Sequence, residues 1–269
     1  MPPDALFGLA GRGAVVTGAH GPIGHAVVAE LVARGARVVA LDHDPAVLES
    51  AAEAGALGVV VDVAEPAALE AALAEADARV DGVELLVNNA GINVRAAPFD
   101  VDLDTWQRIL AVNLTAYFVG ARAVARRLVD RGRSGAIVNV SSTAAATSLG
   151  RGNLAYGVSK AGVDQLTREL AVEFAAAGIR VNAVQPAQVA TPAWAAVRAD
   201  PEGARRYERV VSGIPLGRLV EPAELVGPIL FLLSPAASMV TGTVLPVDGG
   251  NLAFNAAGTP PTRVEGDRT

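Results

Sequence analysis

The chain contains no cysteine and few aromatic residues: only 4% of its 269 residues are Phe, Trp or Tyr. Without cysteine it can form neither disulfide bonds nor thiolate metal sites. Its three histidines, His20, His25 and His43, cluster near the N-terminus without spaced acidic partners, so we expect no metal centre. The core has to be built from Ala, Val, Leu and Ile, and a hydrophobic content of 51% is ample for that.

Long runs of one charge and long apolar runs are absent as well. The net charge is −6, and Lys and Arg are not clustered as they are in proteins that bind nucleic acid. The first residues lack the basic start and apolar stretch of a signal peptide, and glycine or charge interrupts each apolar run before it reaches membrane-spanning length. We therefore expect a cytoplasmic protein with a small-molecule partner, no nucleic acid and no membrane association.

Short β-branched runs alternate with longer Ala- and Leu-rich helical patterns, which is typical of βαβ units. The expected strands are 13–17, 37–41, 57–61, 85–88, 136–140, 180–184 and 243–247, and their near-continuous hydrophobicity indicates strands covered on both faces. The expected helices are 23–34, 46–54, 66–78, 103–131, 153–177 and 222–233. The sequence therefore predicts an α/β fold, a three-layer, doubly wound, Rossmann-type domain with a parallel sheet of about seven strands.

No linker or change of composition interrupts this alternation, so residues 1–251 are predicted to form a single domain. Residues 188–216 lie between a strand and a helix without a sheet partner, and we expect an insertion over the active-site edge that acts as a mobile substrate lid. The tail, 252–269, is rich in Gly, Pro and Thr, and we expect it to be either disordered or docked on a neighbouring subunit.

A glycine-rich turn joins the first strand to the first helix and reads Thr17-Gly18-Ala19-His20-Gly21-Pro22-Ile23-Gly24. Such a turn lets backbone N–H groups approach a pyrophosphate, while the helix N-terminus adds partial positive charge. We predict that the residues of this turn that contact a dinucleotide are Gly18, His20, Pro22 and Ile23. Taken alone, the motif is also compatible with a purely structural connection.

Acidic residues follow the second and third strands. Asp42 lies eighteen positions after Gly24, where a carboxylate can accept hydrogen bonds from both adenosine-ribose hydroxyls and would repel a 2′-phosphate. Because His43 rather than an arginine comes next, NAD is favoured over NADP. Asp62, with Val63 beside it, could meet the adenine amino group. The alternatives are that Asp42 caps the next helix and that Asp62 serves only in a turn or cap.

Tyr156 and Lys160 are four residues apart at the start of a helical pattern, which puts the phenol and the ammonium on one helix face. A free tyrosine has a pKa of about 10, too high for an effective general base at neutral pH. A neighbouring ammonium favours the phenolate, and the positive ring of an oxidised nicotinamide would add to this effect. The pair predicts that Tyr156 is a usable proton acceptor.

Four motifs in this order resemble the short-chain dehydrogenase/reductase family, classical subtype. They are the Thr17–Gly24 turn, Asn88-Asn89-Ala90-Gly91 after the fourth strand, Ser141-Ser142 after the fifth, and Tyr156-Gly157-Val158-Ser159-Lys160. The resemblance extends over nearly the whole chain, from Gly8 to Gly250, and includes the final Val247-Asp248-Gly249-Gly250. It implies that residues 1–251 form a dinucleotide-binding catalytic domain.

The resemblance also implies roles for individual residues. Tyr156 would be the general acid/base, Lys160 would lower its pKa and hold the nicotinamide ribose, and Ser142 would bind the substrate oxygen, unless Ser141 or Thr143 takes that place. Asn113 would anchor a proton-relay water, or else only satisfy a helix kink. The residues expected to line the cofactor cleft are Asn89, Ala90 and Gly91, together with Val189 and Thr191 at the nicotinamide carboxamide.

Three positions depart from the family pattern. Pro22 replaces the middle glycine of the turn, which removes an N–H donor but is well tolerated in a first helical turn. Ala187 replaces the usual glycine after Pro186, and Gln185 replaces a small residue before it. None of these changes touches the acid/base group.

The expected activity is that of an NAD(H)-dependent oxidoreductase that interconverts a secondary alcohol and a ketone, for instance on a sugar, polyol, sugar acid or small cyclic alcohol. The candidate pocket residues are Asn93, Val94, Arg95, Leu149, Arg151, Asn153, Trp194 and Tyr207. The alternatives are an NADP-dependent ketoreductase of biosynthetic type and a non-catalytic scaffold that senses NAD. The resemblance also implies a homotetramer, built through the two long helices and the last strand.

Overall fold

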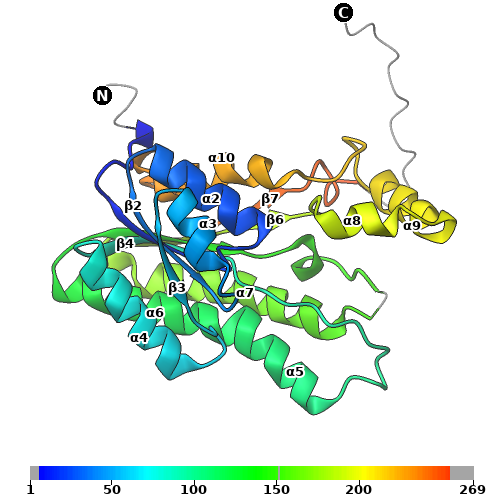
Figure 1. Cartoon of the computed structure of the whole chain (residues 1–269), viewed down its shortest axis with the longest axis horizontal. Coiled ribbons are helices and arrows are strands. Elements are labelled where there is room, and N and C mark those ends of the chain that lie inside the picture. The colour runs from blue at the N-terminus through cyan, green and yellow to red at the C-terminus, as the bar shows by residue number, and fades with distance from the viewer. Residues whose placement is uncertain (1–5, 151, 255–269) are drawn as a thin grey trace, which may run out of the picture.

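The computed structural model describes residues 6–150 and 152–254 and contains one parallel sheet in the order β3-β2-β1-β4-β5-β6-β7 (Figure 1). The strands are β1 (Gly13–Thr17), β2 (Arg37–Asp42), β3 (Leu57–Val60), β4 (Val83–Asn88), β5 (Gly135–Val140), β6 (Ile179–Pro186) and β7 (Val244–Val247). β1, β4 and β5 are buried along their whole length, which explains why their sequences carry no polar alternation. The predicted seven-stranded α/β fold is confirmed.

Helices cover both faces of the sheet. One layer holds α2 (Pro22–Ala33), α3 (Val47–Glu53) and α10 (Pro222–Leu233), and the other holds α4 (Pro66–Arg79), α6 (Ala116–Asp130) and α7 (Leu154–Glu173) (Figure 1). Each layer encloses its own cluster of buried Val, Leu, Ile and Ala side chains against the sheet. Burial of this aliphatic surface on two faces is the main source of stability in a chain with few aromatic residues.

The predicted helix 103–131 is not one regular helix. α5 (Leu103–Leu110) leads into a π-helical turn, η1 (Ala111–Thr115), before α6 begins. Asn113 lies in the middle of this turn and is fully buried. π-Turns of this kind occur frequently at functional sites.

The insertion at 188–216 contains two helices that the sequence reading missed, α8 (Pro192–Val197) and α9 (Pro201–Ser212). It also has a sheet-like contact, because Val189 pairs with Val220 in an isolated parallel bridge, so the expectation of no strand partner was wrong at this point. The predicted tail lies outside the described residues from position 255 onward.

The stretch Leu103–Asp130 is 28 residues long and apolar enough, by length and composition alone, to cross a membrane. However, 61% of its most apolar window is buried inside the protein, where α6 packs against β4 and α4. This burial accounts for its hydrophobicity as part of the core.

The strand order reverses next to β1: β2 and β3 lie on one side of it and β4 on the other. At such a reversal the loops after neighbouring strands diverge and leave a crevice at the carboxyl ends of the strands. The turn after β1 and the loop after β4 therefore face each other across the edge where a ligand is expected.

This edge requires a glycine at position 24. A Cβ at Gly24 would lie 2.2 Å from the carbonyl oxygen of Gly18 and 2.7 Å from Cα of Ala19. We expect Gly24→Ala to lower the free energy of unfolding by about 1–3 kcal/mol, because backbone atoms would have to move. Urea denaturation of the two proteins measures this difference.

The matched control is Gly227→Ala, at an exposed position in α10 where a Cβ would meet no atom within 4 Å. There we expect a change within about 1 kcal/mol. Equal losses in the two variants would contradict the steric explanation.

Candidate active site

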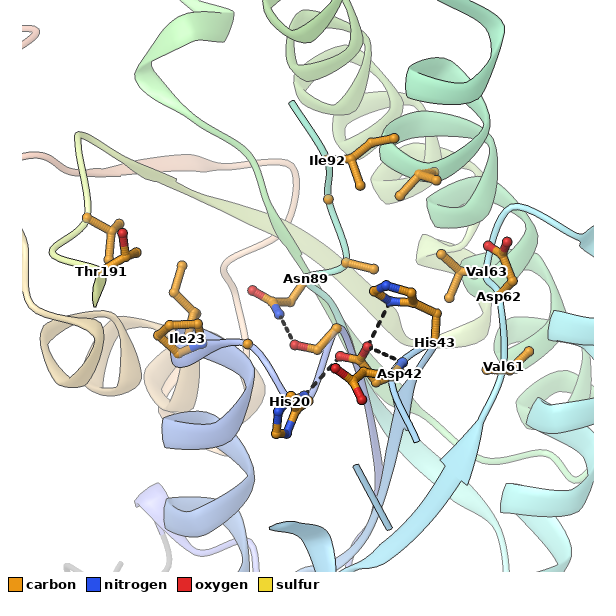
Figure 2. Close-up of a pocket in the computed structure, with 18 of the residues that line it drawn as sticks. His20, Ile23, Asp42, His43, Val61, Asp62, Val63, Asn89, Ile92 and Thr191 are labelled. Carbon is orange, nitrogen blue, oxygen red and sulfur yellow. Dashed lines mark hydrogen bonds and ion pairs between the residues drawn. The ribbon is translucent and has the colours of Figure 1, made fainter. Parts of the chain in front are cut away.

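A crevice lies at the carboxyl ends of β1, β2, β3 and β4, and Figure 2 shows the side chains that surround it. Every residue predicted to bind the dinucleotide, apart from Tyr156 and Lys160, lines it: Gly18, His20, Pro22, Ile23, Asp42, Asp62, Val63, Asn89, Ala90, Gly91, Val189 and Thr191. Segments far apart in the sequence thus meet in one place, as the strand order requires.

The close approach between the turn after β1 and the loop after β4 depends on Gly18. Its φ is +64°, and a Cβ there would lie 2.7 Å from Cα of Ala90. The side-chain amide of Asn89 donates hydrogen bonds to the carbonyl oxygens of Thr17 (3.0 Å) and Gly18 (2.9 Å). Asn89 therefore fixes the glycine turn as well as lining the crevice.

Pro22 is the first residue of α2, with Gly21 as the extended N-cap. The fixed φ of proline suits this position, and its missing N–H would have no partner inside the helix in any case. His25 N donates to the Gly21 carbonyl at 2.8 Å, so the first turn is regular. The departure from the family pattern leaves the start of the helix intact.

Asp42 ends β2 with its carboxylate at the crevice and only 6% of the residue exposed. Its oxygens accept hydrogen bonds from the backbone amides of His20 and Asp44, each at 3.0 Å, and Nδ1 of His43 lies 2.9 Å from Oδ1 (Figure 2). Asp42 thus stabilises the turn that follows it and also faces the crevice, so the two readings of this residue are compatible.

Asp62 accepts hydrogen bonds from the Ala64 amide (3.0 Å) and from Arg108 Nη2 (2.7 Å). Burial acts to raise the pKa of Asp62, but the hydrogen bonds from Arg108 and Ala64 outweigh it and lower the pKa. Arg108 comes from α5 and lines the same crevice, and the sequence reading did not include it. An adenine amino group would have to share this carboxylate with the arginine.

A second pocket adjoins the crevice and holds Ser142, Tyr156 and Lys160. Burial raises the pKa of the Tyr156 phenol, and a hydrogen bond with Ser142 offsets part of that increase. Lys160 Nζ lies 5.9 Å from the centre of the Tyr156 ring. That Lys160 lowers the pKa of Tyr156 stays a prediction.

Lys160 Nζ donates to the carbonyl oxygen of Val140 at 2.7 Å and to the hydroxyl of Tyr117 at 3.2 Å. The residue is 3% exposed, and burial lowers the pKa of Lys160 to about 7, against the opposing charge of Asp164. The Tyr117 hydroxyl in turn donates towards the carbonyl oxygens of Ala90 (3.0 Å) and Val140 (3.2 Å). Tyr117 therefore joins the lysine to the ends of β4 and β5.

Sequence reasoning missed Tyr117. The available signal was a hydroxyl-bearing residue one helical turn after Asn113 in a helix that is otherwise apolar towards the sheet. Burial raises the pKa of this phenol far above its ordinary value, so the hydroxyl stays protonated and can donate.

Asn113 is fully buried and bonds three groups. Its Oδ1 accepts from the Ile92 amide at 2.8 Å, and its Nδ2 donates to the Ile92 carbonyl (2.9 Å) and to Ser159 Oγ (3.0 Å). A Cβ at Gly91 would lie 3.6 Å from both Asn113 Oδ1 and Lys160 Nζ. Asn113 thus ties the loop after β4 to α7 close to the lysine, and its role with a water stays a prediction.

Gln185, one of the three departures, has a defined partner. Its side-chain amide donates to Oδ2 of Asp164 at 2.8 Å, and Ser141 Oγ donates to Oδ1 of the same carboxylate. Burial raises the pKa of Asp164. Because the Ser141 hydroxyl is committed to Asp164 while that of Ser142 meets Tyr156, the geometry favours Ser142 over Ser141 as the hydroxyl that faces a substrate.

The second pocket contains five of the eight predicted substrate residues: Asn93, Arg95, Leu149, Asn153 and Trp194. Val94 and Tyr207 do not line it; Val94 is half exposed to solvent, and Tyr207 packs edge-on against Trp194 instead. Arg151 lies outside the described residues. Arg206, Val210 and Gln188 line the pocket and were not predicted.

Comparison with known proteins agrees with this geometry. The family model described as Enoyl-(Acyl carrier protein) reductase matches residues 18–251, which is more than half of the chain. The chain belongs to the short-chain dehydrogenase/reductase family. Members of this family bind a nicotinamide cofactor, and the chain is an oxidoreductase that interconverts a secondary alcohol and a ketone.

Within the short-chain dehydrogenases, the galactitol 2-dehydrogenase (L-tagatose-forming) of Cereibacter sphaeroides is 43% identical over 251 residues, covering 91% of this chain and 96% of that protein. The L-xylulose reductase of Bos taurus is 43% identical over 247 residues, with coverage of 91% and 98%. A solved structure from Beutenbergia cavernae has a TM-score of 0.85 at 42% identity and covers 92% and 99%. That protein is proposed to be an NAD(P)-dependent gluconate 5-dehydrogenase and holds NADP at low occupancy.

The buried ammonium of Lys160 predicts a pH dependence of stability. Lysine in an unfolded chain titrates near 10.4, so between about pH 7 and 10 the unfolded state holds a proton that the folded state has lost. The free energy of unfolding should therefore rise with pH across this window.

Lys160→Met removes this titration and keeps an apolar stem, and every other titrating group is shared by the two proteins. We expect the wild type to gain about 1–3 kcal/mol relative to Lys160→Met between pH 7 and pH 9.5, measured by urea denaturation. Parallel pH profiles would show that the lysine titrates normally.

Proposed function

We propose that the chain is an NAD(H)-dependent dehydrogenase that interconverts a secondary alcohol and a ketone on a polyhydroxylated substrate. The observation that carries the proposal is the juxtaposition of Tyr156, Ser142 and Lys160 in a pocket that shares a wall with the crevice after β1. A scaffold that only sensed NAD would not need these three groups together.

The crevice suits a dinucleotide. Gly18 and Gly21 present backbone without side chains, α2 begins directly behind them, and Asp42 offers a carboxylate at the far end. The residues that would hold the cofactor are those of the glycine turn, Asp42 with Asp62, the Asn89–Gly91 loop, Lys160 and Thr191. When bound, the nicotinamide supplies or accepts the hydride.

Side chains of the protein would bind the substrate oxygen and accept its hydroxyl proton. Tyr156 would take the hydroxyl proton of the alcohol in the oxidative direction, and Ser142, already hydrogen-bonded to that phenol, would orient the substrate oxygen. Lys160 would favour the phenolate once its ammonium turns from Val140 towards Tyr156 and the ribose. Asn113 would support this site through Ile92 and Ser159. Residues 188–216, which bring Trp194 and Arg206 to the pocket, would close over the substrate.

Two observations support a polyhydroxylated substrate. Amide side chains gather in the second pocket, where Asn93 Nδ2 donates to Asn153 Oδ1 at 2.8 Å and Gln188 lies nearby, so several hydroxyl groups can be paired. The relatives named for galactitol and L-xylulose act on such molecules.

The homotetramer remains a proposal. α6 and α7 leave the apolar side chains of Phe118, Val158 and Val172 exposed, and Val172 is 76% exposed. Burying them between copies of the chain would remove apolar surface from water. The cytoplasmic location also stays a prediction.

Tyr156→Phe tests the chemistry. Because the phenol is the proposed proton carrier, we expect kcat to fall by a factor of about 10³ or more while NADH binding is retained. NAD⁺-linked oxidation of a panel of sugars and alditols, followed by NADH absorbance, measures the first quantity, and fluorescence titration with NADH measures the second. Tyr207→Phe is the matched control and should keep its activity; substantial turnover by Tyr156→Phe would refute the assignment.

Asp42→Asn tests the cofactor preference, which matters because the solved relative holds NADP. Arg108 is already paired with Asp62, and Asp42 itself places a carboxylate where a 2′-phosphate would lie. We expect the wild type to bind NADH at least about 10-fold more tightly than NADPH, and Asp42→Asn to narrow that ratio, because a like-charge repulsion is removed.

The control for this experiment is Asp81→Asn, which changes the net charge equally at an exposed site far from the crevice. It should leave the NADH to NADPH ratio unchanged. Tighter binding of NADPH than of NADH by the wild type would make the NADP-dependent alternative the correct one.

A further inference from the structure

Arg206 on α9 lines the second pocket and carries an unsatisfied buried donor. Its Nε is shielded from solvent and has no hydrogen-bond partner, and no other buried side-chain nitrogen or oxygen among the described residues is in that situation. Buried polar groups are almost always paired, and leaving one unpaired is costly. Arg206 thus brings to the pocket wall a guanidinium whose hydrogen-bonding capacity the protein does not fully use.

The side chain is held in place by an aromatic stack. The Arg206 guanidinium lies 5.8 Å from the centre of the Trp194 ring, and Trp194 meets Tyr207 edge to face at 5.9 Å and 72°. On the outer side, Arg198 lies 4.5 Å from the Tyr207 ring. Cation–π contacts of this kind orient a guanidinium without neutralising it. α8 and α9 thus present a positioned charge to the substrate.

The lining of this pocket is positively charged although the protein as a whole carries a net charge of −6. Arg95 and Arg206 contribute guanidinium groups, and none of the described residues that line it is Asp or Glu. The hydroxyl groups of a neutral polyol can accept hydrogen bonds from these guanidinium groups but carry no charge that the positive lining would attract. A carboxylate gains a charge-assisted hydrogen bond, which is about twice as strong as a neutral one.

We propose that Arg206 anchors a carboxylate of the substrate, so that the substrate is a polyhydroxy acid of the aldonate class rather than a neutral alditol. This inference rests on the proposed function, because the oxidised carbon must lie at Tyr156. The carbinol carbon loses a hydride to NAD⁺, and its hydroxyl proton passes to Tyr156. The products are the keto acid, NADH and one proton, and the carboxylate is unchanged.

The test compares aldonates of four to six carbons with alditols of the same chain length and configuration, for example D-gluconate with D-glucitol. The wild type should oxidise the best aldonate with a kcat/KM at least 10-fold above that of its alditol partner. Arg206→Gln should lower the aldonate kcat/KM by about 10- to 100-fold, mainly through KM, and change the alditol value less than about 3-fold.

Arg205→Gln is the matched control, since Arg205 is exposed on the same helix and does not line the second pocket. It should leave both substrate classes unaffected. Two results would overturn the proposal: an equal loss for both classes in Arg206→Gln, or an increase of KM for NAD⁺, which would place the arginine on the cofactor.

A binding measurement decides the question independently of turnover. The chain has two tryptophans, so in a Trp106→Phe background the fluorescence of Trp194, beside Arg206, reports occupancy. With NAD⁺ present in the inactive Tyr156→Phe protein, D-gluconate should bind at least 10-fold more tightly than D-glucitol. Adding Arg206→Gln should abolish that difference.

The outcomes separate this proposal from the one on which it rests. If the protein oxidises alditols and Arg206→Gln changes kcat/KM for neither substrate class, the proposed role of Arg206 is wrong and the proposed dehydrogenase activity stands. If D-gluconate binds in a way that depends on Arg206 but neither substrate class is oxidised, Arg206 binds a carboxylate as proposed and the proposed dehydrogenase activity is wrong. Equal binding of D-gluconate and D-glucitol would overturn the anchor whatever the turnover.

Discussion

The burial of a lysine ammonium at the end of β5 is the constraint on which the site depends. Burying a charged group costs free energy, and hydrogen bonds to two oxygen acceptors, the Val140 carbonyl and the Tyr117 hydroxyl, offset part of that cost here. Because those acceptors belong to β5 and α6, the lysine fixes α7 against both. Tyr156, one turn earlier on α7, is thereby positioned over the pocket, and Ser142 is brought to it by the strand that ends at Val140.

The order of the elements could be predicted from the sequence because central parallel strands, covered on both faces, appear as short runs of consecutive apolar residues. β1, β4 and β5 are buried at every position because both of their faces are covered, and their residues are mostly apolar, with exceptions such as Glu84, Asn88 and Asn139. The break at η1 could not be read, because a π-turn keeps the apolar periodicity on both sides and adds only one residue to a turn. α8 is six residues long, too short for a periodic pattern, although the Asp200-Pro201 pair was an available start signal for α9.

Some site residues could likewise be predicted from the sequence and others could not. Tyr156 with Lys160, and the glycine turn, were predictable because their chemistry depends on spacing within a few residues. The partners of those residues were not, because they come from distant segments: Tyr117 reaches Lys160 across 43 positions, and Arg108 reaches Asp62 across 46. The hydrogen bonds of Lys160 Nζ to Val140 and Tyr117 are likewise long-range contacts that its spacing from Tyr156 does not predict.

The crevice and the second pocket have a wall in common, formed by Ile23, Asn89, Gly91, Ile92, Val189 and Thr191. A dinucleotide that fills the first cavity therefore becomes part of the boundary of the second. With the coenzyme in place, the surface that a substrate meets would consist of the coenzyme as well as the polypeptide.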